Sequence, residues 1–517
     1  MKKAVGGYRL ILGYLGIFLT MVGIIVLLPL ILLAIPAYRD DLAYLWAFLI
    51  PGLSSIVLGI ILFFAFIFKR EREQLQKHQD SVLLVLVWMS AIAISALPFF
   101  LHNKIVFGDA VVETSMNFTE AIFESTSGYG TIGLTRLPTA LYSSHVFTLY
   151  RAILQFFGGV GLVLVVTSAI SDRYGLKLYI AEGHSDKLIP NLSKSARIII
   201  TIYVGYILLG TVALRIAGVE WFDAICHSIS SVATGGFSSK AGGMLELSGN
   251  MMAIEIITMV LVFLGGTNFV INMLILSGKF RKVGRDIEIR TFGIFVLILL
   301  PMFIISFLTS VNPFSGVNYT VGESFRYGIF AFMTGMTTTG YSNLPAGFAL
   351  APFGVIFLIV CTNVIGAGSG STAGGVKLYR IGVAAKSYFW TIKKKVSKKR
   401  YIFPNYIWRF GERCEVDPYE ANDAFGYIVL YIIILFVGSF LVSLLGHRDL
   451  SDSLFEFSNA LSSTGLSNGL TASLDPVAGI PVMWVMIAGM FAGRLEILAI
   501  YFAFYRIARD IFRKETI

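Results

Sequence analysis

Long apolar runs constrain this chain more than any other feature. A helix needs about 20 mostly apolar residues to cross a bilayer, and ten runs near or above that length recur along the sequence. They lie at residues 10–35, 43–68, 82–101, 146–170, 198–216, 251–277, 291–308, 352–364 with its continuation, 427–445 and 482–505. Only 14% of the residues are charged, against about 25% in soluble proteins. We therefore predict an all-α integral membrane protein with about ten transmembrane helices. The first run is too long for a cleavable signal peptide.

The basic residues lie between these runs and predict the topology. Clusters at 2–9, 69–77, 279–290 and 393–400 all fall on one side of the membrane if the N-terminus is cytoplasmic. The segment 342–350, on the other side, has no Lys or Arg. Because cytoplasmic loops are enriched in Lys and Arg, we predict a multi-pass protein of the cell (inner) membrane with both termini in the cytoplasm. The net charge of +10 then reflects topology, and no nucleic-acid partner is expected.

Four shorter stretches repeat between pairs of spans. They are FTEAIFESTSGYGTIG (118–133), WFDAICHSISSVATGG (221–236), FRYGIFAFMTGMTTTG (325–340) and LSDSLFEFSNALSSTG (450–465). Each ends in a hydroxyl residue, one further residue and a glycine. These glycines are 103, 104 and 125 positions apart, with the extra length in the basic loop after Arg380, and such regular spacing is typical of a repeat architecture. A stretch of about three helical turns is too short to cross a bilayer, so it must dip in and return. Irregular backbone at that depth is tolerated where it lines a water-filled path. Four such turns predict one central pore with fourfold pseudosymmetry.

This reading divides the chain into five parts. Residues 1–78 hold two extra N-terminal helices, and residues 79–178 and 179–284 form the first two helix–pore loop–helix repeats. Residues 285–400 form the third repeat, with a basic cytoplasmic loop, and residues 401–517 form the fourth. All units start on the same side, which disfavours the inverted repeats of many secondary transporters.

The closing triplets suit a cation. Potassium filters are rings of backbone carbonyls, and glycine adopts the dihedral angles that let successive carbonyls face one way. The preceding helix directs its partly negative C-terminus toward the axis, and the four stretches have no Lys or Arg near their closing triplets. Glycine in membrane helices also serves close packing, but four copies in one register favour the pore.

Several segments together resemble the Trk/Ktr/HKT superfamily of potassium transporters, and most closely its Trk-type membrane subunit. They are FESTSGYGTIGLT with LYRAILQFFGGVGLV, HSISSVATGGFSS, MTGMTTTGYSN, GAGSGSTAGGVK and AGRLEI. The likeness runs from about residue 82 to residue 512.

The resemblance implies potassium uptake through a filter formed by four short segments. The potassium-binding residues would be Thr131, Ile132, Gly133, Leu134, Thr234, Gly235, Gly236, Phe237, Thr338, Thr339, Gly340, Tyr341, Ser463, Thr464, Gly465 and Leu466. In this superfamily a serine in place of the first filter glycine goes with sodium selectivity, and Gly133 here favours potassium. The residues after the glycines differ between segments, so a sodium or non-selective cation transporter of the same fold stays open.

The segment 366–375, GAGSGSTAGG, interrupts an apolar run. Each glycine costs a helix about 1 kcal/mol relative to alanine, so we expect an unwound stretch that obstructs the cavity below the filter. It does not match the phosphate-binding GxxxxGK[ST] pattern. The resemblance makes it an intramembrane gating loop. The gate residues would be Gly366, Gly368, Ser369, Gly370, Ser371, Gly374, Gly375 and Arg494.

Arg494 lies in the last apolar run, where a charge costs roughly 3 kcal/mol on insertion scales. It should therefore face the cavity and the loop, or pair with another helix. Asn268 and Lys377 are weaker candidates, read as a helix-packing and an interfacial residue. A glycine also recurs in the second span of each unit, at Gly158, Gly265, Gly366 and Gly489. Close helix crossings are one interpretation of three of them, whereas Gly366 opens the unwound stretch.

An enzyme is not expected. The six histidines are scattered, no HExxH or GxSxG stands in a catalytic context, and the three cysteines form no CxxC pair. No cofactor is predicted on this chain. The resemblance implies a homodimer in the bilayer, docked on a cytosolic TrkA-like nucleotide-binding ring that would hold NAD or ATP/ADP. Docking would involve loops that carry Arg173, Lys177, Lys279, Arg285 and Lys393.

Overall fold

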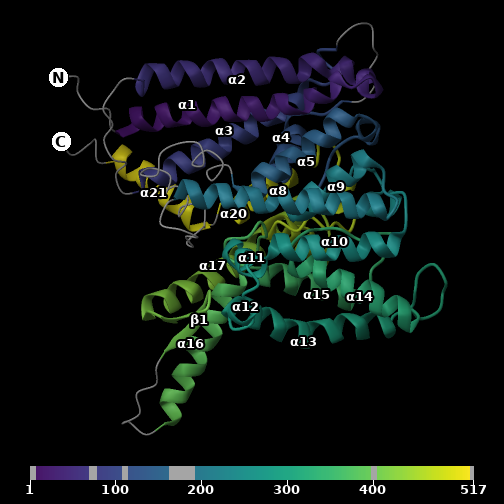
Figure 1. Cartoon of the computed structure of the whole chain (residues 1–517), viewed down its shortest axis with the longest axis vertical. Coiled ribbons are helices and arrows are strands. Elements are labelled where there is room, and N and C mark those ends of the chain that lie inside the picture. Colours follow the sequence, from purple (N-terminus) through teal and green to yellow (C-terminus); the bar gives the residue numbers. More distant parts are fainter. Residues whose placement is uncertain are drawn as a thin grey trace.

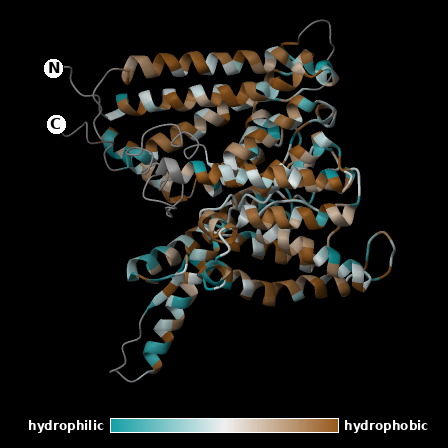
Figure 2. Ribbon diagram, in the orientation of Figure 1, coloured by the Kyte–Doolittle hydropathy of each residue, from teal (hydrophilic) through white to brown (hydrophobic). Residues whose placement is uncertain are grey.

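The computed structural model describes residues 7–68, 78–106, 115–161, 192–397, 405–495 and 497–512. Within these ranges the fold is helical apart from one antiparallel hairpin, β1 (Tyr406–Arg409) with β2 (Glu412–Glu415). Apolar residues dominate the long helices, whereas polar residues gather at helix ends and around the hairpin (Figure 2). The predicted all-α membrane fold is confirmed.

Two N-terminal helices form one edge of the molecule. Helix α1 (Gly7–Leu27) packs along α2 (Leu45–Phe66), and the short η1 (Leu28–Ala34) and η2 (Pro36–Tyr44) connect them (Figure 1). Glycines bring the two backbones together, since a Cβ on Gly16 would lie within 3.0 Å of the Gly59 carbonyl oxygen. Small residues serve this purpose in membrane helix pairs.

Four units follow, each with a long helix, a short helix and a second helix. The elements are α3 (Gln79–Leu101), α4 (Phe118–Tyr129) and α5 (His145–Val160); α8 (Leu192–Ile216), α9 (Trp221–Val232), α10 (Met251–Gly266) and α11 (Phe269–Leu276); α13 (Ile287–Leu308), α14 (Val321–Met336), α15 (Phe353–Ile365) and α16 (Leu378–Val396); and α17 (Pro418–Gly446), α18 (Leu450–Ser462), α20 (Ile480–Arg494) and α21 (Ile497–Phe512). Single turns lie between them: η3 (Thr139–Ser143), η4 (Gly243–Glu246), α12 (Phe280–Val283) and α19 (Leu470–Ser473).

The second spans are less regular than the sequence suggests. Among the described residues, six helices are long and apolar enough to cross a membrane, or up to eight if each bent pair counts as one span. The predicted span 251–277 is bent by 117° between α10 and α11, and 482–505 by 101° between α20 and α21. Helix α15 has 13 residues. The distal part of the predicted span 146–170 lies outside the described residues, as do the unit boundaries after 178 and 400.

The break before α11 has a local cause. Asn268 caps the new helix, because its side-chain oxygen accepts a hydrogen bond from the Val270 backbone N–H at 2.8 Å. Asparagine is among the best N-cap residues and competes with the helix backbone for hydrogen bonds. A hydropathy profile does not detect such a cap, so it predicts one continuous span over these residues.

Several termini of elements gather on one side of the molecule. Tyr8, at the start of α1, donates a hydrogen bond to Asp510 near the end of α21 at 2.9 Å. Helix α16 and the hairpin project toward the same side (Figure 1). Two of the four short helices, α4 and α14, start with a full capping box, formed by Asn117 with Glu120 and by Thr320 with Glu323. The Thr320 backbone N–H, and then its hydroxyl, lower the pKa of Glu323.

Candidate functional site: a four-segment ring and the loop against it

The turn after each short helix has the same backbone structure in all four units. The second residue of each predicted filter segment donates its N–H to the carbonyl five residues earlier, at 2.8–3.0 Å, in the pairs Ile132–Ser127, Gly235–Ser230, Thr339–Thr334 and Thr464–Asn459. The first residue has a left-handed φ of 49–60° in Thr131, Thr234, Thr338 and Ser463. For a β-branched threonine this φ is an outlier. Strain of this kind is held in place by the surrounding structure and is common at functional sites.

The third residue of each segment is a glycine for a steric reason. All four glycines have φ between 74° and 94°. A Cβ on any of them would lie within 3.0 Å of a carbonyl oxygen in the next unit, in the pairs Gly133–Gly235, Gly236–Thr339, Gly340–Thr464 and Gly465–Ile132. These contacts join the first unit to the second, the second to the third, the third to the fourth, and the fourth to the first. The four segments therefore form a closed ring in sequence order.

This ring contains the sixteen predicted filter residues. The four glycines are partly exposed, while the neighbouring residue on each side is buried. The carbonyl oxygens of Ile132, Gly235, Thr339 and Thr464 each approach the filter glycine of the preceding unit, where no Cβ stands in the way. The structure therefore brings the sixteen predicted filter residues together in one ring.

Below the ring, the chain between α15 and α16 forms a non-helical loop over residues 366–377, which we call the glycine-rich loop. It includes positive φ values at Gly366, Gly370 and Gly375. The first turn of α16 begins only after Lys377, whose φ is 82°. The unwound segment predicted from GAGSGSTAGG is present.

Thr372 and Gly374 of the loop contact the ring at the end formed by the first residues of the four segments, which we call the Thr131 end. The Thr372 hydroxyl lies 2.9 Å from the Thr234 hydroxyl and donates to the Gly265 carbonyl at 3.0 Å. The Gly374 N–H donates to the Thr338 hydroxyl at 2.7 Å. On the fourth unit, a Cβ on Gly374 would meet the Ser462 carbonyl oxygen.

The first unit is joined to the same loop. The Thr131 hydroxyl reaches the Thr372 carbonyl oxygen at 3.5 Å. All four units thus touch a loop segment of three residues, Thr372 to Gly374, so this segment lies across the axis of the ring. The sequence reasoning did not select Thr372, which no local pattern separates from the glycines and serines around it.

Arg494, at the end of α20, links the loop to the end of α5 by hydrogen bonds. Its guanidinium donates to the Thr372 carbonyl at 3.1 Å, and to the carbonyls of Gly158 and Gly159 at the end of α5. Of the two predictions for this residue, contact with the loop is the one that the geometry matches.

Asn268 contacts the loop and Lys377, its last residue, bonds back within it, beyond the packing and interfacial roles predicted for them. Asn268 donates its side-chain N–H to the Ser369 carbonyl, and Lys377 donates to the Ala373 carbonyl. Glu288, at the start of α13, accepts the Ser369 backbone N–H at 3.2 Å.

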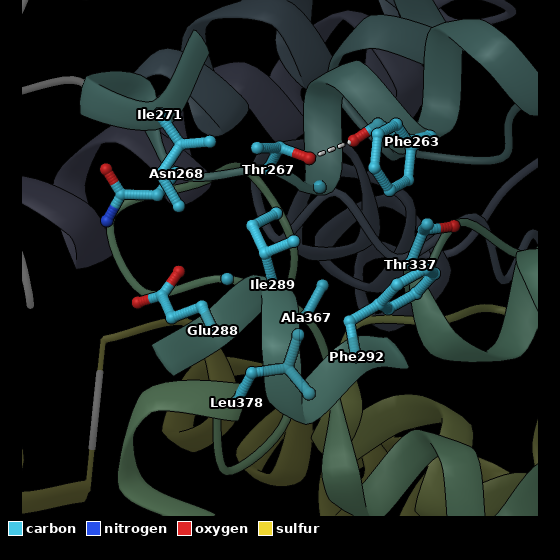
Figure 3. A pocket seen from close by; sticks show the side chains of 12 residues that line it. Phe263, Thr267, Asn268, Ile271, Glu288, Ile289, Phe292, Thr337, Ala367 and Leu378 are labelled. Carbon is cyan, nitrogen blue, oxygen red and sulfur yellow. Dashed lines mark hydrogen bonds between the residues drawn. The ribbon is translucent and has the colours of Figure 1, made fainter. Parts of the chain in front are cut away.

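A small cavity of about 20 Å³ lies beside this part of the loop, enough for about one water molecule. Figure 3 shows Asn268 and Glu288 on neighbouring elements at one end of it, with Ala367 and Leu378 along one side. Thr267 points back to its own helix, where its hydroxyl donates to the Phe263 carbonyl at 2.7 Å (Figure 3). The polar groups around this cavity position the loop.

A buried ion pair supports the other end of the ring between the first two units. Arg151 of α5 bonds Glu124 of α4 at 2.8 Å, and their side chains are 2% and 0% exposed. The same guanidinium donates to the Thr135 hydroxyl at 3.1 Å and to the Ser238 carbonyl at 3.2 Å, and lies 3.9 Å from the Phe237 ring centroid. Sequence reasoning missed the pair, although each charge stands out in an apolar or pore-forming stretch.

Other polar contacts join the remaining neighbours. Arg326 of α14 pairs with Glu255 of α10 at 2.7 Å, linking the second and third units. Asn363 of α15 accepts the Thr464 hydroxyl at 3.0 Å, linking the third and fourth. Arg136 donates to the Thr471 carbonyl at 3.0 Å and closes the circle.

The recurring glycines of the second spans have unequal roles. A Cβ on Gly158 or Gly265 would meet the backbone carbonyl oxygen of Tyr129 or Val232, at the end of the preceding short helix. Gly489 packs against the Phe457 ring instead, and in the fourth unit Gly493 makes the equivalent carbonyl approach, to Leu461. Gly366 starts the loop and does not serve a helix crossing.

This arrangement defines a multi-pass membrane transport protein built from four related units. The sequence model of the TrkH family, described as a cation transport protein, matches residues 47–511, and the chain belongs to this family. It is 28% identical over 513 residues to an uncharacterised cation transporter of Methanocaldococcus jannaschii, covering 97% of this chain and 96% of that protein.

Other relatives carry more specific names. The Trk system potassium uptake protein TrkH of Escherichia coli K12 is 28% identical over 452 residues, with 84% of this chain and 87% of that protein covered. The crystal structure of the potassium transporter TrkH from Vibrio parahaemolyticus superposes with a TM-score of 0.78 at 24% identity, over 96% of this chain and 98% of that one. The structural likeness concerns the fold, which it matches over nearly the whole chain.

Proposed function

We propose that this protein takes up potassium across the cytoplasmic membrane through the four-segment ring, as the names of its relatives suggest for those proteins. The observation that carries the proposal is the closure of the ring. Four first residues with left-handed φ and four glycines that each receive a carbonyl oxygen of the next unit support this reading. Such carbonyls replace the hydration shell of a potassium ion, and the C-termini of α4, α9, α14 and α18 add partial negative charge.

All four filter positions hold glycine, which favours potassium over sodium. Ion uptake by proteoliposomes that contain the purified protein tests this directly. Potassium or rubidium influx that exceeds sodium influx supports the proposal. Sodium influx equal to or above potassium influx would instead favour the second candidate, a sodium or non-selective cation transporter of the same fold.

The glycine-rich loop is the proposed gate. Thr372 to Gly374 lie across the axis at the Thr131 end of the ring, so an ion leaving the ring meets the loop. Residues 366, 368–371, 374 and 375 with Arg494 would form or fasten the gate. Deletion of residues 367–373 should raise ion flux in proteoliposomes. Unchanged flux in a deletion protein that elutes as a single species would count against a gate.

We also propose regulation by a cytosolic nucleotide-binding partner, and a homodimer in the membrane. A chain of contacts leads from the hairpin to the loop. The Phe410 N–H donates to Asp286 at 2.8 Å, and Glu288, two residues further, accepts from Ser369 of the loop. A partner that moves the hairpin would thus move the start of α13 and the loop with it.

Of the predicted docking residues, Lys279 and Lys393 are exposed, and Arg285 lies 5.1 Å from the Trp408 ring of the hairpin. Arg173 and Lys177 lie outside the described residues. Placing these surfaces in the cytoplasm also puts Tyr8 and Asp510, near the two chain ends, on that side. A pull-down with a candidate nucleotide-binding subunit, compared between wild type and a Lys279→Glu/Lys393→Glu variant, tests the docking. Undiminished capture by the variant would exclude these residues.

A further inference from the structure

The second residue of the filter segment differs among the four units. It is Ile132, Gly235, Thr339 and Thr464, so only the second unit has no side chain at this position. In the third unit the Thr339 hydroxyl bonds Thr337 at 2.8 Å, and in the fourth the Thr464 hydroxyl bonds Ser462 at 2.6 Å and Asn363 of the third unit at 3.0 Å. The second unit therefore has an empty place beside its ring carbonyl.

Gln155, from α5 of the first unit, occupies that place. A Cβ built on Gly235 would lie within 3.0 Å of the Gln155 side-chain carbon, oxygen and nitrogen. Gln155 is fully buried at 0% exposure. Its amide oxygen accepts the Ser230 hydroxyl at 2.6 Å, and its amide nitrogen donates to the Gly235 carbonyl at 2.6 Å. The Gly235 carbonyl can only accept a hydrogen bond, so it must face the amide nitrogen, and this leaves the amide oxygen for the Ser230 hydroxyl.

This bond distinguishes one ring carbonyl from the others. Within the described chain, no other hydrogen bond from a side-chain N–H reaches the carbonyls of Ile132, Thr339 or Thr464. A carbonyl that shares its lone pairs with an N–H presents a weaker field to an ion and is held against moving inward. The number, field strength and flexibility of coordinating carbonyls are the quantities from which potassium selectivity is argued.

We propose that Gln155 is a specificity-determining residue of the ring. Its side chain fills the position beside Gly235 that a side chain of the second unit would otherwise occupy. The inference rests on the proposed function, because it assumes that ions pass the ring. By weakening and fixing the Gly235 carbonyl, the amide disfavours the smaller, more strongly hydrated sodium ion, which gains most from a strong and mobile oxygen.

The first test is the ratio of potassium to sodium influx in proteoliposomes for wild type and Gln155→Leu, which keeps the volume and removes the N–H. A net hydrogen bond of ordinary strength corresponds to a fall of roughly 2- to 10-fold in this ratio. Gln79→Leu, the same change at a buried glutamine at the start of α3 and outside the ring, serves as the matched control. An unchanged ratio in Gln155→Leu, with potassium flux retained, would overturn the inference and leave the proposed function intact. Absence of flux in the wild type would instead overturn the proposed function.

A second test does not depend on the folding of Gln155→Leu. Gly235→Thr alone should abolish flux, because its Cβ collides with the Gln155 amide. Adding Gln155→Ala vacates the space, and Gly235 has no positive φ that would exclude a threonine. The double variant should regain flux with a potassium-to-sodium ratio below that of wild type. Equal loss of flux in the single and double variants would contradict the claim that the Gln155 side chain occupies the place of a side chain at position 235.

Discussion

The contact between Thr372 and the ring leads to the sharpest prediction about gating. Thr372→Val keeps the shape of the side chain and removes its hydroxyl. The first lost bond joins the Thr372 and Thr234 hydroxyls at 2.9 Å, and the second is the donated bond, which the Gly265 carbonyl at 3.0 Å shares with the Val232 carbonyl at 3.3 Å. The backbone contacts of Thr372, including its carbonyl with Arg494, remain. The substitution therefore weakens the attachment of the loop without dismantling it.

The size of the effect follows from these two bonds. Each intramolecular hydrogen bond contributes about 0.5–1.5 kcal/mol net, so the closed arrangement loses about 1–3 kcal/mol relative to a detached loop. A difference of that size changes an equilibrium roughly 5- to 150-fold. If the loop is the gate, rubidium influx at low open probability should rise within this range.

The assay is rubidium influx into proteoliposomes that hold equal amounts of purified protein, without any partner. Thr372→Ser is the matched control, because it keeps the hydroxyl and loses only a methyl group. We expect serine to behave like wild type and valine to show the increase, with the rubidium-to-sodium ratio unchanged. Wild-type influx in a well-folded valine variant, or an equal increase in the serine variant, would refute the reasoning.

Three further substitutions test the supports of the ring and the loop. Arg151→Met should destabilise the protein by about 3–5 kcal/mol, since it leaves Glu124 buried without its cation; the thermal midpoint in detergent measures this, and adding Glu124→Gln should recover part of the loss. Gly340→Ala should abolish influx, because its Cβ meets the Thr464 carbonyl and its φ is 91°; a conducting alanine variant would contradict the ring. Arg494→Gln should raise influx by loosening the loop, and a decrease would indicate that the arginine supports an open state instead.

Local patterns made much of this protein predictable. The four short helices and their closing glycines stand in one register, and each glycine proved to be where a neighbouring carbonyl approaches. The unwound segment after Ile365 was predictable for a similar reason, because five glycines in ten residues cannot hold a helix in place.

Features that depend on tertiary contacts could not be read from the sequence. Gln155 looks like an ordinary polar residue of an apolar helix until Gly235, eighty positions away, is found beside it. Thr372 has no local signal that separates it from the serines nearby. The bend before Asn268 was missed because hydropathy records side-chain polarity averaged over a window, whereas a single cap ends the helix.

Potassium uptake in cells that lack their own potassium uptake systems tests the central claim most directly. The chain would be expressed as wild type and as Gly133→Ser, each with a candidate cytosolic nucleotide-binding partner. The account predicts that wild type restores growth at low potassium and that Gly133→Ser shifts uptake toward sodium. The serine Cβ would lie 2.7 Å from the Gly235 carbonyl oxygen, a milder clash than that of a Cβ at Gly340 with the Thr464 carbonyl oxygen, so conduction is altered and not abolished. Failure of the wild type to move potassium, or an unchanged ratio of potassium to sodium uptake in Gly133→Ser, would contradict it.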